Sequence, residues 1–136
     1  MTRKPDIKWL SRDLVIGPKF TLVLSQAEMD AVMQSMNHPT MPYLNPGAPA
    51  TTAHFSRPNG TTSIVGLNLA EALAHTGVEI AGLLVHEAVH IWQDWCAMYG
   101  EKDPSKEFEA YAIQSISQRL MEEYVRKVSS PEIGAL

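Results

Sequence analysis

The chain has 136 residues and a formal net charge of −4, with 11 Lys and Arg residues against 15 Asp and Glu residues. This length favours a single domain and is too short for a TIM barrel, a propeller or a two-domain nucleotide enzyme. The acidic balance disfavours a general nucleic-acid binder, which is normally basic, so we expect no nucleic-acid partner.

The cysteine content and the N-terminal residues bear on the compartment. Cys96 is the single cysteine, so an internal disulfide framework is excluded. Residues 1–17 carry charges and no sustained apolar run, which is not the pattern of a signal peptide. The longest apolar stretch, residues 80–85, is much shorter than the roughly 20 residues that cross a bilayer. We therefore expect a cytoplasmic protein with no membrane partner.

The first half of the chain predicts a strand followed by a helix. Residues 20–24 read FTLVL and predict a short strand. Ser25 with Glu28 three residues later is a capping-box pattern, and it predicts a helix that ends near Asn37.

A proline-rich loop and a β-hairpin are predicted next. Prolines cluster between residues 39 and 58, which excludes a helix there and favours an extended loop. The runs 51–57 and 61–68 flank Pro58-Asn59-Gly60, and Asn-Gly between Thr-rich, β-branched runs indicates a hairpin.

The second half predicts helices. Residues 69–75 predict a short helix, and residues 78–99 predict a long buried helix that ends at Gly100. Asp103-Pro104 predicts the start of a second long helix, with the aspartate as N-cap and the proline in the first helical position. That helix is expected to continue to about residue 128.

Together these elements predict an α+β fold with a small antiparallel sheet. Residues 1–136 are expected to form one domain, with residues 1–17 and 129–136 peripheral or frayed.

Residues 86–90 read HEAVH, which is the HExxH pattern. Residues four apart on a helix share a face, so His86 and His90 can place two imidazoles on one metal ion. Glu87 lies about 100° further around the helix, where it can hold a water that a zinc ion acidifies. The pattern predicts a Zn²⁺ site in which Glu87 is the general base.

A helical projection places this motif in a polar stripe on an otherwise apolar helix. Unpaired polar groups on a buried helix are costly, and a metal with its water in a cleft would satisfy them. The alternative is a pair of core histidines bonded to their neighbours. The stripe occupies roughly one third of the circumference and contains Glu79, His86, Glu87, His90, Gln93 and Asp94.

A catalytic zinc ion needs a third protein ligand and an open position. The second long helix offers Glu107 and, as an alternative, Glu109. Glu107 is preferred because it shares a polar helix face with Tyr111, whereas Glu109 shares its face with apolar residues such as Ile113.

HExxH followed by a helix-borne glutamate resembles the zincin metallopeptidases, in particular the glutamate zincins (gluzincins). Residues 107–111 read EFEAY and fit the second-helix pattern of several branches, with Glu107 as ligand and Ala110 as the small residue. Tyr111 stands where many relatives carry Asp or Asn. The resemblance covers about residues 51–125, and the chain is also similar to small phage- or prophage-type peptidases. It implies a minimal zincin-like domain that hydrolyses peptide bonds in peptide or protein substrates.

The resemblance also implies roles for residues outside the motif. Residues 61–68 correspond to the edge strand that pairs with an extended substrate in zincins. His54, Tyr99 and Tyr111 are candidate hydrogen-bond donors to an oxyanion. Asp94 is a candidate to orient a ligand imidazole, with a salt bridge as the alternative.

Two other functions remain open from the sequence. One is a zincin-fold metal-binding interaction or assembly module with little or no peptidase activity. The other is a metal-free structural protein in which HExxH is accidental. Substrate preference, oligomeric state and the role of the proline-rich residues 39–49 do not follow from the sequence.

Overall fold

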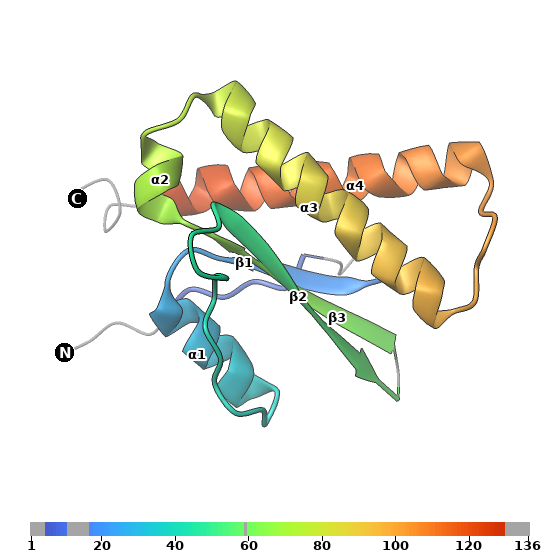
Figure 1. Cartoon of the computed structure of the whole chain (residues 1–136), viewed down its shortest axis with the longest axis horizontal. Helices are drawn as coiled ribbons and strands as arrows, with labels where there is room; N and C mark the ends of the chain where they lie inside the picture. Colours follow the sequence, from blue (N-terminus) through green and yellow to red (C-terminus); the bar gives the residue numbers. More distant parts are fainter. Residues whose placement is uncertain (1–4, 11–16, 59, 130–136) are drawn as a thin grey trace.

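The computed structural model describes residues 5–10, 17–58 and 60–129. A three-stranded sheet and two long helices form most of the structure (Figure 1), which confirms the predicted α+β class. In chain order the elements are β1 (Lys19–Val23), α1 (Gln26–Ser35), β2 (Ala50–Arg57), β3 (Gly60–Leu67), α2 (Leu69–Leu73), α3 (Gly77–Met98) and α4 (Lys106–Val128).

The sheet is mixed, with strand order β1-β3-β2. β2 and β3 pair antiparallel from Ala50↔Leu67 to Arg57↔Gly60, which confirms the predicted hairpin. Asn59 of its turn lies outside the described residues. β1 pairs parallel with β3, so the prediction of a purely antiparallel sheet is wrong. The cause is the long connection through α1, which brings β1 alongside β3 in the same direction.

β3 is the central strand and is buried along nearly its whole length. Its backbone hydrogen-bonds to β1 on one side and to β2 on the other. The prediction that residues 61–68 form a substrate-binding edge strand is therefore wrong, because no edge of β3 is open. β2 is the outer strand of the sheet on the other side of β3, and Figure 1 shows it running alongside α3.

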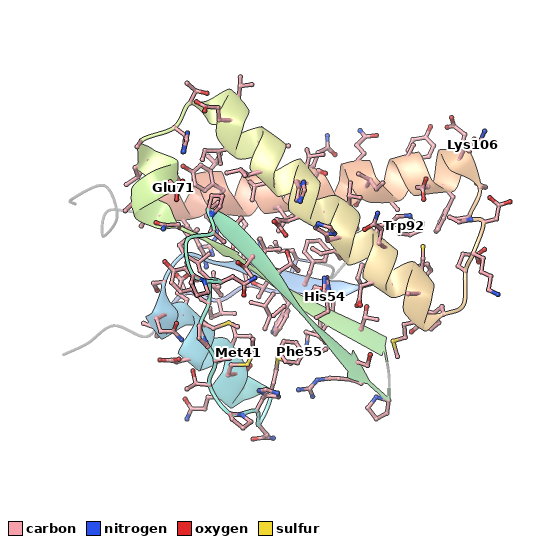
Figure 2. The ribbon with its side chains drawn as sticks, viewed as in Figure 1. Met41, His54, Phe55, Glu71, Trp92 and Lys106 are labelled. Atoms are coloured by element: carbon pink, nitrogen blue, oxygen red, sulfur yellow. The ribbon has the colours of Figure 1, made fainter. Side chains whose placement is uncertain are left out.

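The two faces of the sheet pack against different elements. Phe20, Leu22 and Val65 pack with apolar side chains of α3 and α4 in one core cluster. The other face packs against α1, whose methionines Met29 and Met33 fill the second cluster. Met41 and Phe55 border this second cluster (Figure 2), so part of the proline-rich loop covers the sheet on the side away from α3.

The ends of the long helices show one confirmed and one wrong prediction. α3 ends before Gly100, which has a φ of 68°, as expected for a glycine that closes a helix. α4 begins later than predicted, because its N-cap is Ser105. The Ser105 hydroxyl accepts a hydrogen bond from the Phe108 amide at 3.1 Å, which leaves Asp103 and Pro104 outside the helix.

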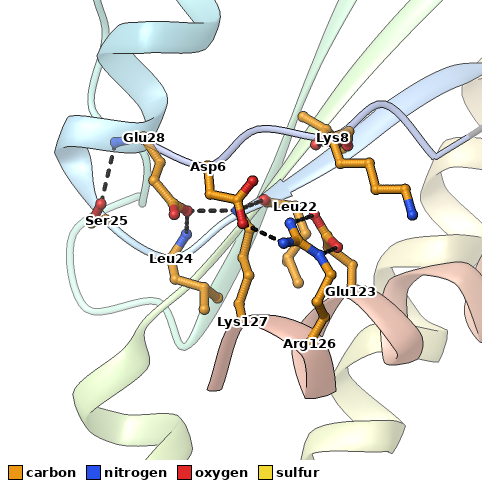
Figure 3. Close-up of polar contacts among 10 residues, drawn as sticks. Asp6, Lys8, Leu22, Leu24, Ser25, Glu28, Glu123, Arg126 and Lys127 are labelled. Carbon is orange, nitrogen blue, oxygen red and sulfur yellow. Dashed lines mark hydrogen bonds and ion pairs between the residues drawn. The ribbon is translucent and has the colours of Figure 1, made fainter. Parts of the chain in front are cut away.

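A buried polar network fastens the end of α4 to the sheet (Figure 3). The Lys127 side chain is 2% exposed, and its Nζ donates to the Leu22 carbonyl at 2.7 Å and to Glu28 Oε1 at 2.8 Å. The same Glu28 oxygen accepts from the Leu24 amide at 2.8 Å. These bonds connect α4, β1 and α1 at one point. Within the described ranges, no helix has the length and apolar character needed to cross a membrane.

Candidate metal and catalytic site

His86 and His90 lie one turn apart on α3, and their rings converge. Their Nε2 atoms are 3.1 Å apart and their ring centroids 4.7 Å apart. Two imidazole nitrogens on one tetrahedral zinc ion, each at about 2.0–2.1 Å, would lie about 3.3 Å apart. The structure thus brings the two rings to a spacing that suits a shared metal ion.

Both histidines are exposed, which differs from the predicted buried stripe. α3 does not bury its whole surface, since Val78 is 83% exposed and Val85 is 37% exposed. Exposed imidazoles can hydrogen-bond to water, so a metal ion is not needed to satisfy them. The support for a metal site therefore comes from the convergence of the two ring nitrogens.

Glu87, unlike His86 and His90, is buried, with 7% of its surface exposed. Its Oε2 accepts a short hydrogen bond from the hydroxyl of Thr52 on β2. Glu87 and His86 line a cavity of 630 Å³ between α2, α3 and the start of β2, and Pro49 and Ala50 lie on the opposite wall. A carboxylate held in this way beside an open cavity can accept a proton from a water molecule there.

His54 lies on β2 beside α3, where Figure 2 labels it. Its Nδ1 is 2.9 Å from Ser63 Oγ and 3.6 Å from Asp94 Oδ2. Burial lowers the pKa of the His54 imidazole, and the negative charge of Asp94 acts in the opposite direction. Asp94 therefore pairs with His54, whereas His90 Nδ1 is 3.3 Å from Gln93 Oε1. The Asp94 carboxylate thus lies beside His54, and the motif residue His90 contacts Gln93 instead.

The glutamates of α4 do not meet the histidine pair. Trp92 Nε1 donates to Glu109 Oε2 at 2.8 Å, and Glu107 is exposed in the first turn of α4. Trp92 lies roughly 140° around α3 from the histidines. In residues 5–10, 17–58 and 60–129, no three His, Cys, Asp or Glu side chains are grouped so that they could hold a metal ion. Antiparallel packing of α3 and α4 occurs, but on the tryptophan face of α3.

The tyrosines also lie near tryptophans. Tyr111 is 66% exposed and lines an apolar pocket with Trp92, Trp95 and Phe108. Tyr99 packs on Trp95, with ring centroids 5.1 Å apart. Of the three candidate oxyanion donors, His54 lies on β2, the strand whose Thr52 contacts Glu87, whereas Tyr99 and Tyr111 lie beside tryptophans.

Two contacts of α3, one at this site and one on its tryptophan face, do not follow from the sequence. Thr52 had no distinguishing pattern, because its role depends on which strand lies beside α3. The bond from Trp92 to Glu109 had a weak signal, since a buried indole N–H usually requires an acceptor. Cys96 is buried, and burial raises the pKa of its thiol, which disfavours the reactive thiolate form.

No protein-family model, curated protein or solved structure matches this chain.

Proposed function

We propose that this protein is a zinc-dependent hydrolase of peptide bonds, with His86 and His90 as metal ligands and Glu87 as general base. The observation that carries the proposal is the 3.1 Å approach of the two Nε2 atoms on the HExxH helix. Supporting it, Glu87 is buried next to this pair and lines the same 630 Å³ cavity as His86. In this proposal the two histidines would bind the metal, Glu87 would be the base, and the cavity would admit the substrate.

A zinc ion at this pair would act as a Lewis acid that polarises the scissile carbonyl and acidifies water. Glu87 accepts the proton from the attacking water as the water oxygen bonds to the carbonyl carbon. Glu87 then returns the proton to the amide nitrogen, which leaves as an amine when the carbon–nitrogen bond breaks. Thr52 holds Glu87 Oε2, so the carboxylate keeps its orientation during both transfers.

An extended peptide would pair with the outer edge of β2. β2 pairs with β3 on one side, and its other side is an edge of the sheet. Unpaired edge strands accept peptides through backbone hydrogen bonds. β2 also carries the Thr52 hydroxyl that contacts Glu87, so a peptide on this edge would lie beside the base.

The replacement Glu87→Gln tests the proposal. We expect hydrolysis of a diverse peptide library, measured by mass spectrometry, to fall about 10³-fold, because general-base catalysis contributes about 10²–10⁴-fold. Zinc content should be unchanged, since Glu87 is not a ligand. Glu101→Gln, at an exposed position, is the matched control and should retain full activity. Equal hydrolysis by wild type and Glu87→Gln would exclude Glu87 as the base.

A second candidate is a metal-binding interaction module with little or no peptidase activity. It is favoured by the lack, in the described part of the chain, of a third acidic or histidine side chain grouped with the pair. Glu107 stays a sequence-based candidate for that third ligand. A wild-type protein that binds zinc but cleaves no library member would support the module over the peptidase.

A further inference from the structure

The cavity beside the histidine pair extends along α3 toward the start of the helix. His86 and Glu79 both line it, together with Gly82 and Leu83. Gly82 and Leu83 are three or four positions from both Glu79 and His86, so these residues share one face of α3. Seven residues separate Glu79 from His86, which is about 10 Å along the helix axis. The cavity therefore connects the proposed metal pair to a carboxylate about two turns away.

The part of this face between Glu79 and His86 is apolar and has little bulk. Gly82 has no side chain, and a Cβ there would have no atom within 4 Å. Leu83 is partly buried and packs against the main core, and Pro49 and Ala50 line the cavity from the start of β2. An aliphatic chain in this position would bury apolar surface without displacing any side chain.

The end of the cavity away from the motif carries negative charge. Glu71 on α2, labelled in Figure 2, lines the cavity together with Glu79, and both side chains are roughly half-exposed. His75 lies between them, with its Nδ1 3.0 Å from Glu79 Oε2 and its Nε2 3.8 Å from Glu71 Oε1. Among the described residues that line the cavity, none is Lys or Arg. A cationic group would be attracted to this end, and an anionic group would be repelled.

The Glu79 carboxylate can bind a further donor. Its Oε1 accepts the Thr76 amide at 3.0 Å, and the hydrogen bonds from Thr76 lower the pKa of Glu79, which favours the charged form. An ionised carboxylate has about four acceptor positions on its two oxygens. The capping of α3 and the contact with His75 therefore leave room for an ammonium or guanidinium group.

We propose that this cavity accepts a lysine or arginine side chain of the substrate. The aliphatic stem lies against Gly82 and Leu83. Glu71 and Glu79 bind the cationic head group. Lysine and arginine suit such a cavity, because they place their stems along apolar surface and keep their charged ends in water. This inference rests on the proposed function, since the other end of the same cavity contains two residues of the HExxH motif.

The test measures substrate preference. In a peptide library randomised on both sides of the cleaved bond, Lys and Arg should be enriched at one fixed position. Peptides with Arg, Met or Glu at that position then give kcat/KM values. We expect Arg to exceed Met about 10-fold and Glu to be the poorest, because half-exposed ion pairs are individually weak and two carboxylates contribute. Glu71→Gln and Glu79→Gln should each reduce the preference for Arg, and the double variant should abolish it.

The variants have matched controls. Glutamine also forms a capping box, so Glu79→Gln keeps the start of α3 intact. Glu101→Gln, at an exposed position, removes the same charge elsewhere and should keep the full preference for Arg. Gly82→Leu fills the apolar part of the cavity, so it should slow hydrolysis of the Arg and Met peptides more than that of an Ala peptide. Far-ultraviolet circular dichroism verifies that each variant is folded.

Binding without turnover provides a second readout. Fluorescence anisotropy measures the affinity of labelled Arg and Met peptides for Glu87→Gln protein equilibrated with Zn²⁺. We expect the Arg peptide to bind about 10-fold more tightly than the Met peptide at low salt. Adding Glu71→Gln and Glu79→Gln should remove this difference, and raising the salt concentration should reduce it.

The outcomes separate this inference from the proposed function. Hydrolysis with no preference for Lys or Arg, or a preference that survives in the double glutamine variant, would overturn the inference and leave the zinc-hydrolase proposal standing. If the Arg peptide binds tightly through both glutamates but the wild-type protein cleaves no peptide, the cavity binds basic side chains and the proposed hydrolysis is wrong. Loss of the preference in both assays on removal of the two carboxylates supports the inference.

Discussion

The carboxylate of Glu87 is buried, while His86 and His90 on the same helix are exposed. This contrast follows from the position of β2, which covers α3 on the Glu87 side and contacts it through Thr52. Exposed imidazoles are accessible to a metal ion from solvent. A buried carboxylate with a single fixed hydrogen bond has few orientations. The two residue types of the motif therefore lie in the environments that their proposed roles require.

The contact between Thr52 and Glu87 gives a prediction at the residue scale. Thr52→Val removes the hydroxyl with little change in shape, and we expect kcat/KM to fall about 10-fold while zinc content is unchanged. Thr61→Val is the matched control, because the buried Thr61 hydroxyl has no hydrogen-bond partner in the described structure. Steady-state hydrolysis of one cleaved peptide provides the measurement. Full activity of Thr52→Val would show that this hydroxyl does not position Glu87.

The histidine pair could be predicted from the sequence because its geometry is local. Side chains four residues apart on one helix are neighbours, and this does not depend on the rest of the fold. The side from which a third ligand would approach could not be predicted in this way, because it depends on which face of α3 packs against α4. The tryptophan face of α3 is the one that meets α4: the Trp92 ring contacts Phe108, and Trp92 and Trp95 line one pocket with residues of α4. The sequence showed those tryptophans as part of an apolar face but did not specify their partner.

At the scale of elements, the helix and hairpin boundaries were predicted within a few residues, whereas strand order was not. The hairpin is set by its own turn, so β2 and β3 follow from local sequence. The parallel pairing of β1 with β3 is a contact between distant segments, and it is what makes β3 central. The predicted start of α4 was wrong because Asp and Ser are both favourable N-cap residues, and the N-cap in the structure is Ser105 rather than Asp103.

The approach of the proline-rich loop to the sheet gives a prediction for Gly66 in β3. A Cβ at Gly66 would lie 2.0 Å from the carbonyl oxygen of Tyr43, which is a backbone atom and cannot move alone. We expect Gly66→Ala to lower the free energy of unfolding by about 2 kcal/mol, because overpacking costs about 1–3 kcal/mol. Urea denaturation measures this change.

Gly82→Ala is the matched control for that measurement. Gly82 lies inside α3, and a Cβ there has no atom within 4 Å. Alanine should therefore stabilise the helix by about 0.5–1 kcal/mol. Equal effects of the two replacements would contradict the close contact between Tyr43 and β3.

At the scale of the whole molecule, Lys127 connects elements from both ends of the chain. Its Nζ bonds the Leu22 carbonyl and Glu28, so β1, α1 and α4 meet at one buried charge (Figure 3). Lys127→Met removes the positive charge beside Glu28 and a donor to the Leu22 carbonyl, and we expect a loss of about 3 kcal/mol in the free energy of unfolding. Lys102→Met, at an exposed lysine, should be close to neutral. Chemical denaturation of both variants decides whether this ion pair contributes to stability.

The central claim concerns the metal, and elemental analysis of zinc in the dialysed protein tests it most directly. We expect about one zinc ion per wild-type chain after equilibration with Zn²⁺ and removal of excess, since the proposed histidine pair would bind a single ion. The variants His86→Ala and His90→Ala, which each remove one of the two converging nitrogens, should contain almost no zinc. A wild-type protein without zinc, or variants that retain it fully, would contradict the account.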